Sequence, residues 1–220
     1  MMSDKWHSSF ITYHSSLIIV TAIFYILIIL FSVVIHEVSH GYVAYLLGDP
    51  TAKMQGRLTL NPLKHLDPFG SVLLPALLYL ANAPVIGWAK PVPYNPYNLQ
   101  AGKWGPALVA VAGPISNFIV AIFFALAIRF NLLYTFAAPA FNDFCLLVVV
   151  LNVLLAIFNL IPIPPLDGSK VLFSALPYRL RYIETFLERY GIVFIVLFLF
   201  YGGTIIFPLE QWVVRVLVGG

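Results

Sequence analysis

The sequence predicts an all-α protein that crosses a membrane several times. Of its 220 residues, 61% are hydrophobic and only 10% are charged, and the mean hydropathy is +0.93. A water-soluble domain of this length cannot bury so much apolar surface. Several apolar runs reach the roughly 20 residues that a spanning helix needs, and most charges lie in the short segments between them. We therefore expect about four transmembrane helices in one membrane-embedded domain, residues 1–220.

The first apolar segment runs from about Ser16 to Leu47. It is longer than a bilayer requires, so we expect it to tilt or to overhang the membrane. Its N-terminal flank lacks the basic start and the small-residue cleavage site of a secretory signal, which predicts a retained span. The next stretch, Gly48 to Pro68, is polar and rich in turn formers, and the alternation from Gly56 to Leu60 predicts a short β-strand.

The second apolar stretch, Phe69 to Ala83, has only 15 residues and contains Pro75. This length favours a re-entrant or interfacial helix over a full span. The proline-punctuated segment that follows, Gly87 to Gln100, is expected to be extended near the site described below. Further spans are predicted at about Gly105 to Phe130, Phe141 to Ile161 and Tyr190 to Phe207. The tail from Pro208 is expected to lie on the membrane surface as a short amphipathic piece.

The basic residues of the loops predict the orientation in a cell membrane. If Phe69 to Ala83 does not cross, nine lysines and arginines fall on one side of the membrane and three on the other. The nine are Lys53, Arg57, Lys64, Lys90, Lys103, Lys170, Arg179, Arg181 and Arg189, and the three are Lys5, Arg129 and Arg215. The positive-inside rule then places the nine in the cytoplasm and the N-terminus outside.

The first apolar segment carries the sequence His36-Glu37-Val38-Ser39-His40 in its second half. Histidines four residues apart project from one helix face, so both can reach a single Zn²⁺ at about 2.0–2.1 Å. Glu37 follows the first histidine directly and can act as the general base. Ionisable groups within a span are costly, about 2.5–3.5 kcal/mol for a central Asp, Lys or Arg, and usually face an interior site. This location favours a zinc site in the cytoplasmic half of the membrane.

A catalytic zinc takes three protein ligands, and Asp167 is the candidate for the third. It follows the third predicted span, where three prolines between residues 162 and 165 end the helix and Gly168 permits a close backbone approach. The structural alternative is that Asp167 caps the next helix. Glu184 and Glu188 are alternative ligands, but their Arg-rich segment has the charge spacing of a solvated helix face.

The ordered pair of motifs resembles the signatures of the site-2 protease family of intramembrane zinc metalloproteases. The family's HExxH corresponds to residues 36–40, and its NxxPxPxLDG corresponds to Asn159 to Gly168 (NLIPIPPLDG). AGPISN, residues 112–117, is similar to the family's GPxxN element. The resemblance covers a core of about residues 16–172, while the extra C-terminal span of about residues 190–207 matches only in general character.

The resemblance implies a zinc metalloendopeptidase with one Zn²⁺ per chain and Glu37 as its general base. The implied zinc ligands are His36, His40 and Asp167. The family also suggests that Asn117 and Asn159 donate to an oxyanion or hold the substrate backbone; the structural alternative is an interhelical hydrogen bond. Family members cut transmembrane segments of partner proteins, to release regulators or to clear signal-peptide remnants. The implied partners are therefore transmembrane substrates and the lipid bilayer.

The family pairs unwound substrate with an extended segment, for which Gly87 to Tyr94 and Gly56 to Leu60 are the counterparts here. The chain leaves no room for the peptide-binding insert or nucleotide-sensing domain of some members, so no nucleotide is expected. A dispersed formal charge of +3 predicts no nucleic-acid partner. The competing reading is a non-proteolytic zinc-binding membrane protein or a metal transporter. The intact Glu37 and the lack of an internal repeat argue against it.

Overall fold

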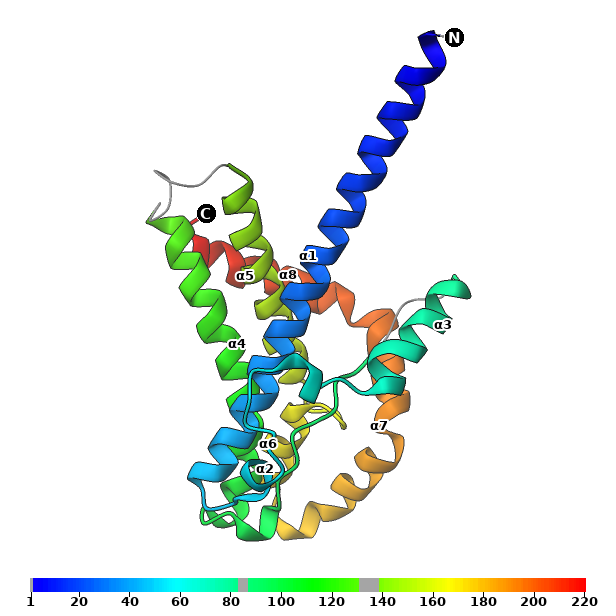
Figure 1. Ribbon diagram of the computed structural model, residues 1–220. Coiled ribbons are helices and arrows are strands. Elements are labelled where there is room, and N and C mark those ends of the chain that lie inside the picture. The colour runs from blue at the N-terminus through cyan, green and yellow to red at the C-terminus, as the bar shows by residue number, and fades with distance from the viewer. Residues whose placement is uncertain (1, 83–86, 131–138) are drawn as a thin grey trace.

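The protein is a helix bundle in which α4 (Gly105–Arg129) is the central member. The computed structural model describes residues 2–82, 87–130 and 139–220, with side chains at residues 21–82, 87–130 and 141–220. Helix α4 contacts α1 (Met2–Leu46), α5 (Pro139–Asn159), α6 (Asp167–Ala175) and α8 (Gly203–Val218), and Figure 1 shows α1 and α5 running alongside it. The remaining long helix, α7 (Arg181–Tyr201), follows α6.

Three helical stretches are long and apolar enough to cross a membrane, namely Thr21–Leu46, Gly102–Arg129 and Phe141–Asn159. They coincide with the first three predicted spans, which confirms a multi-pass membrane protein. Large apolar side chains on these stretches, such as Ile26, Ile119 and Phe123, are more than 60% exposed. Water disfavours such a surface and lipid tails accept it. The polytopic all-α fold class is therefore confirmed.

The face of α4 that meets its neighbours consists mainly of small residues. Ala110, Gly113, Asn117, Ala121 and Ala125 follow one another at spacings of three or four, and all are buried. Small side chains let helix backbones approach closely, and van der Waals packing rather than the hydrophobic effect holds helices together in lipid. This face explains why α4 can pack against several other helices.

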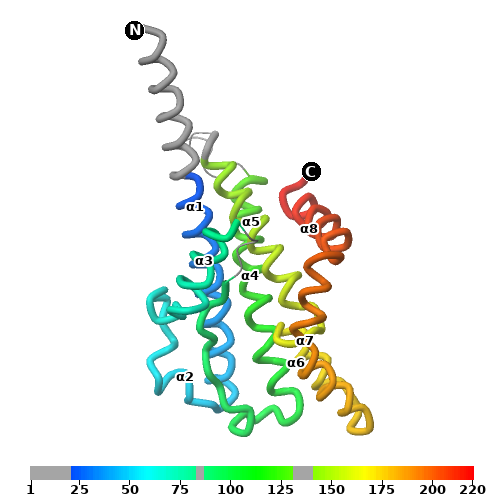
Figure 2. The backbone as a smooth tube through the Cα atoms, turned by 90° about the vertical axis from the view of Figure 1, so that its right-hand side faces the viewer, coloured from blue at the N-terminus to red at the C-terminus, as the bar shows by residue number. Residues whose placement is uncertain are grey.

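The C-terminal region differs from the predicted span at Tyr190 to Phe207. Helix α7 ends at Tyr201, and α8 turns away from it by 70°, so the two form at most one bent span. The predicted surface tail is part of α8 and packs against α4 and α5 (Figure 2). Ile206 and Val214 of α8 are buried, and Val214 joins the core around Ala121 and Val153. The sequence shows that α8 has an apolar face. Hydropathy alone cannot distinguish whether this face packs on the small residues of α4 or lies on lipid.

The short helix at residues 68–80 agrees with the prediction for that stretch. It begins as a π-helical turn, Pro68–Leu73, and continues as α3, Leu74–Leu80. Asp67 caps it by accepting hydrogen bonds from the N–H groups of the two residues after Pro68. Its parts of 6 and 7 residues make about 20 Å, well short of the roughly 30 Å hydrocarbon core. The last residue of the predicted segment, Ala83, lies outside the described residues.

No β-strand occurs among the described residues, so the strand predicted at Gly56 to Leu60 is wrong. The prediction that Gly87 to Gln100 is extended holds in part, because residues 87–95 form no helix whereas Pro96–Asn98 form a 3₁₀-helix. The part from Gly87 to Tyr94, called the extended segment below, makes isolated hydrogen bonds rather than a ladder. Trp88 N donates to Gly70 O at 3.1 Å, and Lys90 N donates to His65 O at 2.8 Å. The two prolines of the segment, Pro91 and Pro93, have no N–H, so they cannot continue such a ladder.

Candidate metal centre

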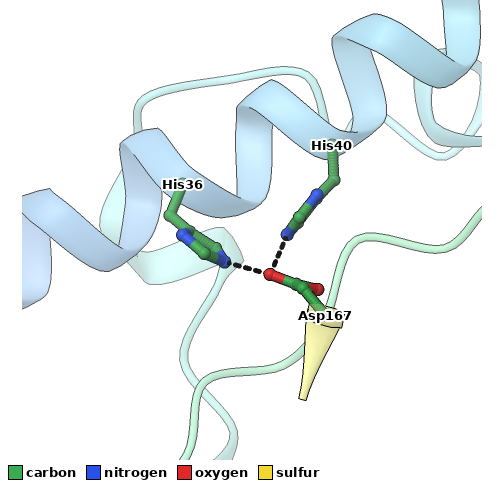
Figure 3. A group of neighbouring side chains, drawn as sticks. All are labelled: His36, His40 and Asp167. Atoms are coloured by element: carbon green, nitrogen blue, oxygen red, sulfur yellow. Dashed lines mark ion pairs between the residues drawn. The ribbon is translucent and has the colours of Figure 1, made fainter. Parts of the chain in front are cut away.

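The three predicted zinc ligands lie together although they come from distant parts of the chain. Asp167 Oδ2 is 3.0 Å from His36 Nε2 and 3.3 Å from His40 Nε2 (Figure 3). The ligand atoms of the three residues lie within 4.8 Å of one another. Successive turns of α1 present the two imidazoles, whose ring centroids are 4.6 Å apart, and α6 presents the carboxylate at its first residue. Both histidines are buried.

The hydrogen bonds of the two imidazoles leave their Nε2 atoms free to bind a cation. His40 Nδ1 donates to the Val109 carbonyl oxygen at 2.7 Å, and His36 Nδ1 donates to Asn117 Oδ1 at 2.6 Å. A neutral imidazole has one N–H, so both Nε2 atoms are then bare acceptors. They face Asp167 Oδ2, which is buried and receives no hydrogen bond from any described residue. Three lone pairs that meet in a buried place repel one another unless a cation lies among them, and two imidazoles with one carboxylate suit Zn²⁺.

Asn117 belongs to a buried polar network that sequence reasoning missed. Its Nδ2 donates to Asn152 Oδ1 at 2.9 Å and to the Ser32 carbonyl at 3.3 Å. Asn152 Nδ2 in turn donates to Ser32 Oγ at 2.9 Å, and both amides are fully buried. Because its donors are engaged in this way, Asn117 orients His36 in the structure. The signal for Asn152 was present in the sequence as an amide in the apolar run of the third span.

Asn159 is not joined to this network or to the metal ligands by any described contact. Its Nδ2 donates to the Leu155 carbonyl at 2.9 Å, one turn earlier in its own helix. The role suggested for it by the motif stays a prediction.

Two glycines allow the backbone elements around the metal ligands to approach one another closely. A Cβ on Gly113 of α4 would lie 2.5 Å from ring atoms of both His36 and His40. A Cβ on Gly168 would collide with the carbonyl oxygen of Leu160 at the end of α5. Only a hydrogen fits at these two positions, so the glycines bring α4 against the imidazoles and turn Asp167 toward them.

Glu37 lies beside the extended segment rather than among the metal ligands. Its Oε2 accepts a hydrogen bond from the Val92 N–H at 2.8 Å. Val92 also packs at Gly41, where an added Cβ would lie 2.5 Å from Val92 Cγ1. The buried Arg57 holds the segment from another direction, since its Nη2 donates to Lys90 O at 2.8 Å and to the next carbonyl at 3.3 Å. The predicted general base and the extended segment are thus in direct contact.

The alternatives weighed for the third ligand are not supported by the structure. Glu188 Oε1 lies 3.5 Å from Lys170 Nζ in a partly exposed ion pair, and Glu184 lines a cavity that Lys170 also lines. Neither is in the metal group, which contains one carboxylate, that of Asp167. The capping role for Asp167 is also wrong, because Leu166 is the N-cap of α6 and no side chain caps that helix.

The relatives found by comparison with known proteins are named as candidate zinc metalloproteases. The model of the family described as peptidase family M50 matches residues 134–201. YwhC of Bacillus subtilis (strain 168), named as a candidate zinc metalloprotease, is 41% identical over 180 residues, which are 79% of this chain and 78% of YwhC. No solved structure gives a significant match.

Proteins called Rip2, also named as candidate zinc metalloproteases, are more distant relatives. The Rip2 of Mycolicibacterium smegmatis is 32% identical over 146 residues, covering 65% of this chain and 53% of Rip2. The Rip2 of Mycobacterium tuberculosis (strain H37Rv) is 30% identical over 156 residues, covering 69% and 55%. The zinc named in all three relatives agrees with the ligand set built from His36, His40 and Asp167. By its similarity to YwhC over more than two thirds of both proteins, the chain belongs to peptidase family M50, the site-2 protease family.

Proposed function

We propose that this chain is a zinc metalloendopeptidase that cuts membrane proteins within or beside their transmembrane segments. The observation that carries the proposal is the convergence of His36, His40 and Asp167, with their lone pairs directed at one another. The two histidines lie on a helical stretch that qualifies as a membrane span, and Asp167 opens the short helix α6 beside it. The relatives' names as zinc metalloproteases support the same reaction class.

Zn²⁺ held by His36, His40 and Asp167 would act as a Lewis acid that polarises a peptide carbonyl and lowers the pKa of water. Other groups of the chain orient the ligands and transfer the proton. Asn117 and the Val109 carbonyl fix the ring orientation of the histidines. Glu37 takes a proton from water as the general base and passes it to the leaving amine. The Val92 N–H holds Oε2 of that carboxylate, which leaves Oε1 for the proton.

The proposed substrates are themselves transmembrane segments. The site lies between α1, α4 and α6, beside apolar spans, so a membrane helix can approach it sideways whereas a folded soluble protein cannot. Helical peptide bonds are internally hydrogen-bonded and must be opened before hydrolysis. The extended segment (Gly87–Tyr94) touches Glu37 through Val92, and we propose that the opened chain lies along it, held by side-chain contacts and by the few backbone groups not already bonded.

The test is cleavage of a reconstituted membrane substrate by the purified protein, with and without a zinc chelator. E37Q should retain zinc, because the three ligands remain, and should lose at least about 100-fold in cleavage rate, because the base is missing. H40A should lose both zinc and cleavage. Zinc content is measured by elemental analysis of the same samples. Cleavage by E37Q at the wild-type rate would show that Glu37 is not the base. Zinc binding without any cleavage by the wild type would favour the alternative, a non-proteolytic zinc-binding protein or metal transporter.

A further inference from the structure

A cavity lies beside α6, among the starts of two membrane helices. It has a volume of about 420 Å³. Its lining comes from the first turn of α4, from α6, from the first turn of α7 and from the chain just after the extended segment. Figures 1 and 2 both show the starts of α4 and α7 at the same end of the bundle. The cavity is large enough for a small polar ligand.

The lining of this cavity is basic. It contains Lys103, Lys170 and Arg181 but only one carboxylate, that of Glu184. Lys170 is also paired with Glu188, at 3.5 Å and with both side chains more than 40% exposed. A pair so open to solvent is weak and can be exchanged for another anion. The cavity therefore attracts a negatively charged group.

Aromatic rings hold these cations at the edge of the apolar region. Lys103 lies over the Trp104 ring at 5.2 Å, and Lys170 lies over the Phe173 ring at 5.7 Å. Lysines and aromatic rings combined in this way are typical of the level of the lipid headgroups, where the stems face apolar surface and the charges face water. Lys103 is also the second residue of the span Gly102–Arg129, so the cavity opens at a membrane surface.

The first turn of α4 adds a further attraction for anions. This helix has 25 residues, and no side chain caps its start, while Pro106 of that turn lines the cavity. The Gly105 N–H is bonded to the Gly102 carbonyl and Pro106 has no N–H, so the attraction for negative charge at this end comes from the helix dipole. The cationic side chains and the dipole of α4 therefore attract an anion to the same cavity.

We propose that this cavity binds the phosphate headgroup of an anionic phospholipid. A phosphodiester matches the excess of cationic side chains, and its glycerol and acyl part match the apolar remainder of the lining, which includes Phe173 and Leu176. The inference goes beyond peptide hydrolysis and does not depend on it. Bound lipid would also contact α6, in which Lys170 is about one turn after Asp167, and the extended segment, in which Tyr94 is two residues after Val92.

The test is lipid binding by the full chain in nanodiscs of phosphatidylcholine that contain a small fraction of spin-labelled phosphatidylglycerol. K103Q/R181Q should weaken the binding of phosphatidylglycerol, measured from its motionally restricted component, about tenfold or more, because two of the phosphate-binding cations are lost. The control is K64Q/R189Q, which removes the same charge from two exposed side chains outside the cavity and should leave binding unchanged. K103R/R181K, which keeps both charges, should restore most of the affinity.

Three outcomes would overturn the proposal. Equal losses in K103Q/R181Q and K64Q/R189Q would show general surface attraction instead of a site. Displacement of the lipid by glycerol phosphate at equimolar concentration would assign the cavity to a free phosphate ligand. Unchanged lipid binding together with a raised KM for substrates that carry acidic juxtamembrane residues would assign it to substrate. Because lipid binding is measured without cleavage, failure of the proposed protease activity leaves this test intact.

Discussion

At the residue scale, the metal centre depends on how its two histidines are held. Each Nδ1 has an acceptor from α4, a side-chain amide for His36 and a backbone carbonyl for His40. Such outer contacts fix the tautomer and the ring orientation of a ligand and make it more basic. Asn117 is in turn held by Asn152, so the chain of contacts reaches from α1 through α4 to α5.

The first prediction at this scale concerns Asn152. N152L keeps the branched arrangement of side-chain heavy atoms but removes the oxygen that accepts from Asn117 Nδ2 and the N–H that donates to Ser32 Oγ. We expect zinc affinity, measured by competition with a fluorescent chelator, to fall about tenfold. N159L is the matched control, because the amide of Asn159 bonds only within its own helix. Equal zinc affinity of N152L and the wild type would contradict a positioning role for Asn152.

At the element scale, the loops after α1 place the extended segment at Glu37. Asp49, just beyond α1, is fully buried and accepts hydrogen bonds from Asn95 N at 2.7 Å and from Asn98 Nδ2 at 2.8 Å. Burial raises the pKa of Asp49, but the hydrogen bonds it accepts outweigh this effect and hold its pKa below the ordinary value. Arg57 holds the other end of the segment at Lys90. The extended segment is therefore fastened on both sides of Val92.

The prediction for this element is a change in substrate binding with zinc retained. R57Q loses the charged hydrogen bonds to Lys90 O and Pro91 O, so we expect KM for a membrane substrate to rise about tenfold. Zinc content should stay at the wild-type level, since Arg57 touches no ligand. K53Q removes a neighbouring charge that bonds Tyr45 Oη at the surface and should change neither quantity. Loss of zinc in R57Q would show that Arg57 supports the fold of the site instead.

A second prediction at the element scale concerns the substrate helix. Gly or Pro near the cut site should speed cleavage, because both weaken a helix and expose its peptide bonds. Replacing such a residue by Leu in a reconstituted substrate should lower the cleavage rate about tenfold, whereas the same change two turns away should not. The rates are measured by gel analysis of the products. Equally fast cutting of an unrelated soluble protein in intact membranes would contradict a preference for opened transmembrane helices.

At the scale of the whole molecule, α4 connects the metal centre with the other helices of the bundle. It packs on α1, α5, α6 and α8, and it supplies the contacts that orient both histidines. The basic residues Lys103, Lys170 and Arg181 lie at the end of the bundle where α4 and α7 begin. The charge distribution predicts that this end faces the cytoplasm.

The prediction at this scale is the orientation itself. Single cysteines introduced at Lys53 and Arg179, in a chain whose buried Cys145 is replaced by alanine, should react with an impermeant maleimide only from the cytoplasmic side. A cysteine near Arg129, at the far end of α4, should react only from outside. Labelling is read by mass shift in right-side-out and inverted vesicles. Exclusive labelling of position 179 from outside would overturn the proposed topology.

The sequence by itself determined the elements whose cause is local. Apolar runs of spanning length in a medium without water must be helical, because each backbone group must be satisfied within its own segment. The spacing of His36 and His40 follows from the period of that helix, and three prolines stop α5 before Asp167. The structure confirms the helices and brings the three predicted ligands together.

Only the tertiary structure decided which groups meet across the bundle. The alternation at Gly56 to Leu60 indicated a strand, but a strand needs a partner whose N–H groups are available, and the neighbouring extended segment contains prolines. The packing of α8 on α4 depends on small residues far away in the chain. The sequence shows Asn117 and Asn152 as polar groups in apolar spans. Their pairing with each other and with His36 requires the distances between helices, which residue patterns along one segment do not contain.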